Sequence, residues 1–248
     1  MNHFLKGVAR ALCASFVLPE PILEIGSYQV EGQEDLINLR GLFAGQEYIG
    51  LDLRPGPGVD LVGNVEKLDL LDGSVGTVIA FSTFEHVQRF WLGFEEVHRV
   101  LRPDGVFLVA CPFYFRFHAF PNDYWRFTPP ALDLLLDKYP TRILGWHGPE
   151  QRPANVWAAA FREEAQTPTP DQYARYCTLL GQYAHEPLSW TRQWRYRLGQ
   201  LLCGRRPFAP FLDHNVWHTE MRRAERPRYL LPRPSEAEEP FLAWKESA

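Results

Sequence analysis

Short apolar runs alternate with segments of helical periodicity over about the first 110 residues of the chain. The runs at 21–26, 47–53 and 106–113 are apolar almost throughout. The segment 70–82 begins as a turn and continues as a buried run, and a shorter apolar stretch lies within 60–68. Runs of this length bounded by turn residues predict strands, and their apolar character is typical of a parallel sheet covered on both faces.

Helical spacing separates these runs. A helix predicted over 31–44 has three apolar residues on one face: Leu36, Leu39 and Phe43. Apolar residues recur at a 3.6-residue period over 84–101, where "LRPDG" ends the pattern. Thr128 followed by two prolines predicts the first turn of another helix, because the missing N–H of proline does no harm there. Two later apolar runs, "TRILGWHG" and "NVWAAAFRE", predict a terminal hairpin.

The N-terminal segment has two interpretations. Four apolar residues recur at helical spacing: Phe4, Val8, Leu12 and Phe16. Two basic residues before the apolar "ALCASFVL" also loosely resemble a signal peptide, but that run is short and no small-x-small cleavage site follows it. We therefore expect an amphipathic helix packed on the domain.

Composition narrows the class of protein. The chain has 248 residues, 46% of them hydrophobic, and a formal net charge of −4, so no global basic field favours nucleic acid. No run approaches the ~18 apolar residues that a membrane span requires. The four cysteines are far apart and form no C-x-x-C pair, which predicts free thiols in a reducing, cytoplasmic compartment. Cys111 is interpreted as a buried strand-end thiol rather than a nucleophile.

The pattern breaks at 166–170, "QTPTP", and the rest of the chain is predicted to be helical and irregular. We therefore expect one domain over 1–165 and a helical, Arg/Trp-rich extension over 166–248. Between 187 and 233 there are ten Arg, no Lys and three acidic residues. One helical face there carries Trp190, Trp194, Leu198, Leu201 and Leu202. This face could pack on the domain, bind an anionic acceptor or partner, or lie on an anionic membrane surface.

The turn after the first predicted strand suggests a cofactor. It runs from Glu24 through Gly26 and Tyr28 to Gly32. A dinucleotide would require G-x-G-x-x-G, so Tyr28 disfavours NAD. Asp52 ends the next strand, where an acid can accept hydrogen bonds from ribose hydroxyls. A tight turn without a ligand, and an aspartate that merely caps its loop, remain the alternatives.

Several segments occur in an order that resembles one family. These are "ILEIGS", "YIGLDL", "GNVEKLDLLDGSVGTVIAFSTFEHV", "EVHRVLRPDGVFLVACPF" and "HAFPNDYWRFTP". Together, over roughly residues 20–160, they resemble the class I S-adenosylmethionine-dependent methyltransferases, and among them the methyltransferase type 11-like group. The resemblance implies an α/β, Rossmann-like three-layer sandwich. Its mostly parallel seven-stranded sheet would end in an antiparallel hairpin and would be followed here by the helical extension.

The resemblance also implies S-adenosyl-L-methionine as cofactor and assigns residues to it. Those around the methionine part would be Glu24, Gly26, Ser27, Tyr28 and Gly32. Those around the ribose and adenine would be Asp52, Leu53, Asn64, Val65 and Glu66. Phe81 and Ser82 would line the cofactor at the end of the fourth strand. This turn departs from the family's usual three glycines, and Asn64 stands where the family often has Asp.

The residues for catalysis come from loops after the fourth and fifth strands. Candidates for the base that removes an acceptor proton are His118, His86 and Asp123. His86 could instead be a residue satisfied at a helix start, and Asp123 could form a structural ion pair with Arg126. His118 and Asp123 alone do not make a metal site, so no metal is expected. The loop 111–129 is aromatic-rich and is interpreted as a wall of the acceptor pocket.

We therefore expect a methyltransferase that acts on a small-molecule or glycan-type acceptor, most simply at oxygen. The alternative from another class is a non-catalytic protein that keeps the fold as a binding scaffold. An anionic acceptor would suit the arginines of the extension. Nucleic acid is disfavoured as a substrate, because the "[ND]PP[YF]" motif is absent. Peripheral membrane contact is a lesser alternative, and the sequence predicts no oligomeric state.

Overall fold

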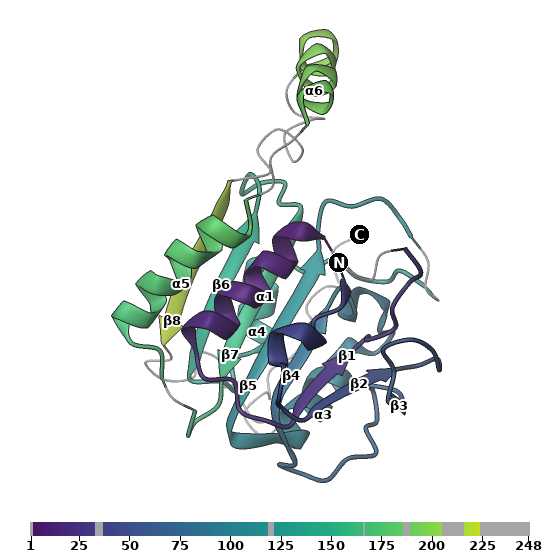
Figure 1. The fold of residues 1–248 in the computed structure, drawn as a ribbon, viewed down its shortest axis with the longest axis vertical. Coiled ribbons are helices and arrows are strands. Elements are labelled where there is room, and N and C mark those ends of the chain that lie inside the picture. The colour runs from purple at the N-terminus through teal and green to yellow at the C-terminus, as the bar shows by residue number, and fades with distance from the viewer. Residues whose placement is uncertain are drawn as a thin grey trace, which may run out of the picture.

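The predicted apolar runs form the strands of a single sheet (Figure 1). The computed structural model describes residues 2–32, 37–118, 122–165, 167–185, 189–204 and 216–223. Within them the sheet has eight strands in the order β3-β2-β1-β4-β5-β7-β6-β8. Their bounds are β1 Ile22–Ile25, β2 Tyr48–Asp52, β3 Leu61–Val62, β4 Val75–Phe81, β5 Leu101–Pro112, β6 Thr141–His147, β7 Asn155–Phe161 and β8 Trp217–Arg223.

The direction of the strands agrees with the expected fold class. Strands β3, β2, β1, β4 and β5 are mutually parallel, and β7 runs antiparallel between β5 and β6. Every residue of β4 and β7 is buried, as all-apolar strands in the centre of a covered sheet require. The mostly parallel sheet with a terminal antiparallel hairpin is thus confirmed.

The count of seven strands is corrected by β8. This strand comes from the extension, which the sequence predicted to be helical. It pairs antiparallel with β6 along seven residues of each strand, and the pairing runs from Thr141 opposite Arg223 to His147 opposite Trp217. Trp217 and Met221, on alternate positions, pack against the core. The edge of β6 offered unpaired backbone groups, and this period-2 segment satisfies them.

Helices cover both faces of the sheet (Figure 1). One face is covered by α1 (His3–Ser15), α5 (Pro170–Tyr183) and the short 3-10 helix η1 (Arg40–Phe43). The other is covered by α3 (Phe90–Val100) and α4 (Pro129–Leu135). The amphipathic N-terminal helix is therefore confirmed. The Thr128 side chain accepts a hydrogen bond from the Ala131 N–H and caps α4 as predicted.

One predicted helix is described only in part, and another differs in the structure. Of the helix predicted over 31–44, residues 33–36, Leu36 among them, lie outside the described residues, Ile37 is α-helical, and Arg40–Phe43 form a 3-10 helix with Leu39 and Phe43 buried. The helix predicted over 84–101 is split into η2 (Phe84–His86) and α3. The split has a cause: the carbonyl of Glu85 accepts the N–H groups of Tyr124 and Trp125, so it does not continue a helix.

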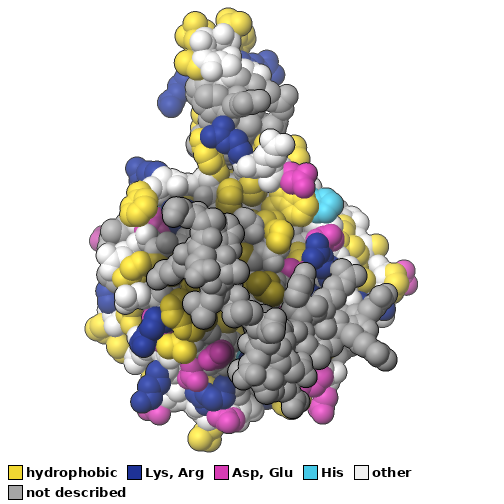
Figure 2. All heavy atoms as spheres, turned by 180° about the vertical axis from the view of Figure 1, so that it is seen from behind, with side chains coloured by type: hydrophobic (Ala, Val, Ile, Leu, Met, Phe, Trp, Pro, Cys, Tyr) yellow, Lys and Arg dark blue, Asp and Glu magenta, His cyan; other side chains and the backbone are white. Residues whose placement is uncertain are grey.

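The helix α6 (Trp190–Cys203) stands apart from the sheet in Figure 1. None of its residues is buried, so the predicted apolar face does not pack on the domain. Figure 2 shows apolar and basic side chains beside one another on this projecting part. Across the part of the chain that the structure describes, every helix is too short or too polar to traverse a lipid bilayer.

Candidate cofactor and acceptor site

The site lies where the order of the strands reverses. The chain builds β1, β2 and β3 outward on one side, then returns to add β4 on the other side of β1. Connections that leave these strands diverge, and ligands of open α/β sheets bind in the crevice formed at the carboxyl ends. The predicted cofactor residues on β1, β2 and β4 all fall at this edge.

Gly26 forms the turn after β1. It lies very close to Thr83, which follows the end of the neighbouring strand β4. Its φ is +83°, and a Cβ built there would lie 2.3 Å from Oγ1 of Thr83. That hydroxyl donates a hydrogen bond to the carbonyl of Ile25 at 2.9 Å. Ser82, which precedes it, has a left-handed φ of +55°, a strained conformation for a residue with a side chain. The Thr83 side chain thereby joins the ends of β1 and β4, and it leaves no room for a side chain at position 26.

Asp52 is held at the end of β2 by backbone donors. Its Oδ2 accepts the Tyr28 N–H at 3.3 Å, and its Oδ1 accepts the Arg54 N–H at 3.1 Å. The Arg54 guanidinium lies 4.3 Å from the centroid of the Tyr28 ring. The carboxylate therefore caps its loop, as one interpretation held. Each oxygen also retains acceptor capacity for a hydroxyl, so the cofactor interpretation is not displaced.

Two polar side chains line the first turn, Glu24, which is half-buried, and Ser27, which is buried. Glu24 accepts a hydrogen bond from the Tyr48 hydroxyl at 2.7 Å. Burial raises the pKa of Glu24 to about 7, although that hydrogen bond and the nearby Arg40 charge oppose the rise. Ser27 is 4% exposed, and its hydroxyl has no hydrogen-bond partner among the described residues. Gly32 has a left-handed φ of +78°.

The residues assigned to adenine differ in their freedom to bind it. Leu53 is 53% exposed and Val65 is buried. The Asn64 Oδ1 already accepts the Glu66 N–H at 2.9 Å, which leaves the amide N–H₂ of Asn64 for a ligand. Although partial burial opposes it, hydrogen bonds from Arg89 keep the pKa of Glu66 below its ordinary range. Glu66 thus serves foremost as the partner of Arg89.

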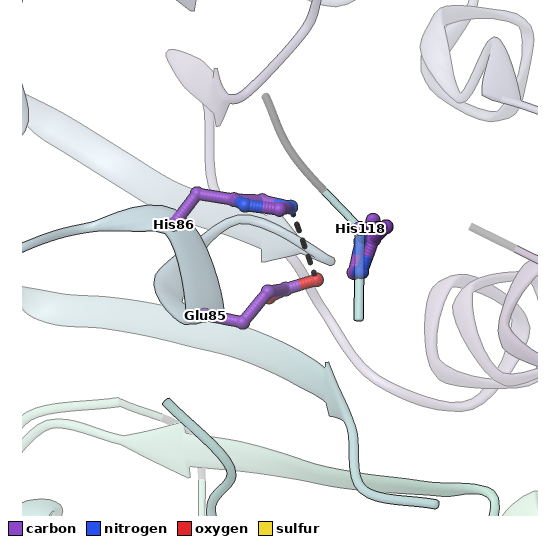
Figure 3. Close-up of side chains that lie close together, drawn as sticks. All are labelled: Glu85, His86 and His118. Atoms are coloured by element: carbon purple, nitrogen blue, oxygen red, sulfur yellow. Dashed lines mark ion pairs between the residues drawn. The ribbon is translucent and has the colours of Figure 1, made fainter. Parts of the chain in front are cut away.

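A second group of side chains lies beyond the ends of β4 and β5 (Figure 3). The His86 Nδ1 is 2.6 Å from the carbonyl oxygen of Asn122, and its Nε2 is 3.8 Å from Oε1 of Glu85. The rings of His86 and His118 meet edge to face with centroids 4.8 Å apart. The His118 Nδ1 lies 2.9 Å from Oδ2 of Asp123. The three predicted catalytic residues are therefore brought together from segments more than thirty residues apart in the sequence.

Asp123 also forms the ion pair that the sequence left open. Arg126 donates two hydrogen bonds to it, one to each oxygen, and the one to Oδ2 is 2.7 Å long. These hydrogen bonds hold the pKa of the Asp123 carboxyl well below its usual range, although its burial opposes the shift. Asp123 is therefore ionised across the physiological range. It orients His118 more readily than it could accept a proton.

Glu85 is the residue that the sequence analysis missed. Its side chain is fully buried, and neither carboxylate oxygen has a hydrogen-bond partner among the described residues. Burial raises the pKa of Glu85 to about 8, and the negative charge of Asp123 adds to the rise while Arg126 opposes it. The signal was present in the "FEHV" segment, next to His86, but burial of an acid cannot be recognised from its neighbours. Cys111 is fully buried, which raises the pKa of its thiol well above the ordinary value and makes it a poor nucleophile.

Comparisons with known proteins agree with this geometry. Residues 38–109 match the methyltransferase type 11 family model, described as "Methyltransferase domain". A curated protein of Mycolicibacterium smegmatis named "Probable S-adenosylmethionine-dependent methyltransferase" is 46% identical over 57 residues. That match spans 23% of this chain and 22% of the relative, about a fifth of its length.

One solved structure shares the fold. The 1,6-didemethyltoxoflavin-N1-methyltransferase of Burkholderia thailandensis, solved with 1,6-didemethyltoxoflavin and S-adenosylhomocysteine, aligns with a TM-score of 0.50 at 19% identity. The alignment covers 64% of this chain and 79% of that one. A SAM-dependent methyltransferase from Archaeoglobus fulgidus aligns with a TM-score of 0.49 at 14% identity over 64% of this chain and 93% of that one.

The sheet order and layers are those of a Rossmann-like α/β protein, and the strand reversal defines a ligand crevice. The family match over residues 38–109 and the curated relative agree with the resemblance to the class I S-adenosylmethionine-dependent methyltransferases, and the solved structure shares the fold. The resemblance predicted from the sequence is confirmed.

Proposed function

We propose that this chain transfers the methyl group of S-adenosylmethionine to an oxygen of a small-molecule or glycan-type acceptor. The observation that carries the proposal is the pairing of two constellations at one edge of the sheet. A glycine-closed turn and Asp52 lie at the ends of β1 and β2. A cluster of Glu85, His86, His118 and Asp123 lies beyond β4 and β5. The first constellation suits the methyl donor, and the second suits the acceptor.

The turn holds the donor by shape and hydrogen bonding. Asp52 would accept the ribose hydroxyls, and the unpartnered Ser27 hydroxyl would meet the methionine part. S-adenosylmethionine carries no phosphate, so it does not need the second glycine of a pyrophosphate cradle, and Tyr28 is tolerated there. Bound in this way, the cofactor supplies a methyl group on a sulfonium. In an in-line displacement the neutral thioether S-adenosylhomocysteine would be the leaving group.

The cluster beyond β4 and β5 prepares the acceptor. A hydroxyl becomes a stronger nucleophile as it loses its proton, and an imidazole within hydrogen-bond reach can take that proton. Asp123 lies beside His118 and accepts a hydrogen bond from its backbone N–H, so it would hold this residue in place. The loop around His118 also exposes aromatic side chains: Tyr114 is 37%, Phe115 54% and Phe117 85% exposed. Exposed aromatic faces favour a ring-shaped acceptor, such as a sugar or a phenol.

Arginines provide the basis for an anionic acceptor. Arg152 donates a hydrogen bond to the Tyr114 hydroxyl at 2.8 Å and stacks on its ring at 4.4 Å, at the rim of the aromatic loop. Arg192, Arg195 and Arg197 lie on the separate helix α6. An arginine at the rim can pair with a phosphate or a carboxylate of the acceptor in bidentate geometry.

Calorimetric titration tests the donor site first. We expect S-adenosylhomocysteine to bind in the micromolar range and NAD to give no heat of binding. Methyl transfer from labelled S-adenosylmethionine to phenols and to anionic sugars then tests the activity. Binding of the product without transfer to any acceptor would favour the scaffold alternative. Absence of S-adenosylhomocysteine binding would contradict the proposal as a whole.

A further inference from the structure

We propose that Glu85, His86 and His118 bind one divalent transition-metal ion next to the cofactor crevice. Each residue offers one ligand atom, and these three atoms lie within 4.8 Å of one another. In Figure 3 the Glu85 carboxylate points toward the space between the two imidazole rings. One carboxylate and two imidazoles form a ligand set that occurs in both zinc and iron sites and leaves positions open for a substrate.

The distances require little rearrangement. Ligand bonds of about 2.1 Å place two ligands of one tetrahedral ion about 3.4 Å apart. The three ligand atoms lie within 4.8 Å of one another, so the cluster needs to contract by at most about 1.4 Å, which side-chain rotations can provide. The two histidines come from different segments, η2 and the loop after β5, and the loop is tied to η2 by the hydrogen bonds from Tyr124 and Trp125 to the Glu85 carbonyl. The ligand geometry is thus fixed by backbone contacts.

The buried carboxylate is the independent observation. A fully buried acid whose oxygens lack hydrogen-bond partners is rare, because an unmade hydrogen bond there is costly. Arg126 does not satisfy it, because that guanidinium is bound to both oxygens of Asp123. A metal ion would supply the missing partner and the compensating positive charge.

Neighbouring groups orient both rings as they do in established metal sites. The Asn122 carbonyl, 2.6 Å from the His86 Nδ1, favours the tautomer with the proton on that nitrogen and leaves Nε2 on the side of Glu85 as the ligand. The Asp123 carboxylate lies 2.9 Å from the His118 Nδ1 and accepts a hydrogen bond from the His118 backbone N–H at 3.1 Å, which positions that residue. Imidazole ligands favour Zn²⁺, Fe²⁺ or Mn²⁺ over Mg²⁺, which prefers a shell of oxygen atoms.

This inference deepens the proposed function, on which its catalytic meaning rests, because the ion would hold the acceptor oxygen beside the methyl donor and would favour loss of its proton in place of a free imidazole. Binding of the metal itself does not depend on that function. The test therefore begins without cofactor or acceptor. The full chain is freed of metal with a chelator, dialysed and titrated calorimetrically with Zn²⁺ and, separately, with Mn²⁺.

Three variants test whether the metal binds at this cluster. Glu85→Gln keeps the size of the side chain but removes its charge, and His118→Ala removes one ring. His185→Ala is the matched control, because His185 is an exposed histidine that follows α5 and is not part of the cluster. We expect one equivalent of metal to bind the wild type and the control alike. Both cluster variants should bind roughly tenfold more weakly or worse.

Thermal unfolding of each variant verifies that it is folded. If the wild type binds no metal, or if both cluster variants bind it as the control does, the metal site is refuted. In either case S-adenosylhomocysteine binding, measured on the same samples, reports separately on the proposed function. Retained nucleoside binding with no metal binding would refute this inference alone.

Discussion

At the scale of single residues, the two constellations separate donor binding from acceptor chemistry. Gly26 follows β1 and Asp52 ends β2. Their backbone and carboxylate groups form hydrogen bonds between the first turn and β2. His118 belongs to the loop after β5 and touches Asp123 and His86. Substitutions in the two groups should therefore change different measured quantities.

Replacing Asp52 with alanine should weaken S-adenosylhomocysteine binding by about 10- to 100-fold. This is the range that the loss of charge-assisted hydrogen bonds to the ribose would produce, about 1.5–3 kcal/mol. Calorimetry measures the effect directly. Asp104→Ala is the control, because Asp104 pairs with Arg102 near the start of β5 and should leave the affinity unchanged. An unchanged affinity in Asp52→Ala would contradict the assignment of the pocket.

Replacing His118 with alanine should lower kcat about 10²- to 10⁴-fold, the usual contribution of a positioned proton acceptor. The affinity for S-adenosylhomocysteine should stay within about twofold, because His118 lies outside the donor turn. Steady-state kinetics and calorimetry on the same preparation provide the two values. A variant that kept full turnover would show that the acceptor is prepared by other residues.

At the scale of elements, the contact between α1 and α5 joins the N-terminal helix to the first helix of the extension. Gly7 of α1 lies against the backbone of α5 and of the residue that follows it, so closely that a Cβ there would be 2.6 Å from Cα of Ala184. Trp157 of β7 donates a hydrogen bond to the Tyr176 hydroxyl of α5 at 3.0 Å. The extension is therefore packed into the same core as the N-terminal helix.

Gly7→Ala should destabilise the fold by about 1–3 kcal/mol, since the added methyl group meets backbone that cannot rotate away. Gly181→Ala is the matched control on α5, where the nearest atom would be 3.8 Å from the new Cβ. The control should be neutral or slightly stabilising because alanine favours helix. Urea unfolding measures the free energy of unfolding of both variants. Equal values would show that the close contact between α1 and α5 does not contribute to stability.

At the scale of the whole molecule, one part of the extension packs against the domain and another part does not. Its helix α5 and strand β8 complete the core and the sheet, whereas α6 projects away (Figure 1). The boundary proposed at residue 165 is therefore a boundary in composition and not one between two cores. Arg and Trp side chains on α6 are not buried, and their binding of an anionic acceptor or partner is still a prediction.

The stability of the whole molecule should depend on pH through Glu24. The pKa of Glu24 is raised to about 7 in the folded protein, against 4.5 ordinarily. Between these values the folded state holds a proton that the unfolded state releases, so stability falls as pH rises through this window. The contribution is on the order of 1–3 kcal/mol.

Urea unfolding at several pH values between 4.5 and 8 measures this dependence in metal-free protein. Glu85 acts in the same direction, whereas the lowered pKa of His86 and His98 makes stability rise with pH below 6.5. The difference between the wild type and Glu24→Gln isolates one group, and the variant should lose part of the decline. Identical profiles would show that Glu24 is not protonated in the fold.

The sequence by itself determined the elements whose signal is local. The buried runs predicted β1, β2, β4 and β5, because a strand covered on both faces must be apolar along its length. Gly26 and Asp52 were recognisable for the same reason: a turn conformation and a strand-end acid are properties of a few adjacent residues. The order of these motifs was enough to indicate the family.

The tertiary structure decided what depends on residues far apart in the chain. Strand β8 forms because the edge of β6 lacks a partner, and Thr219 meets Leu144 from 75 positions away. The helix predicted over 84–101 is interrupted because the distant loop at 122–125 binds the Glu85 carbonyl. The same contact buries Glu85 beside His86 and His118. The charge, exposure and partners of these side chains are set by that distant contact and cannot be read from their neighbours in the sequence.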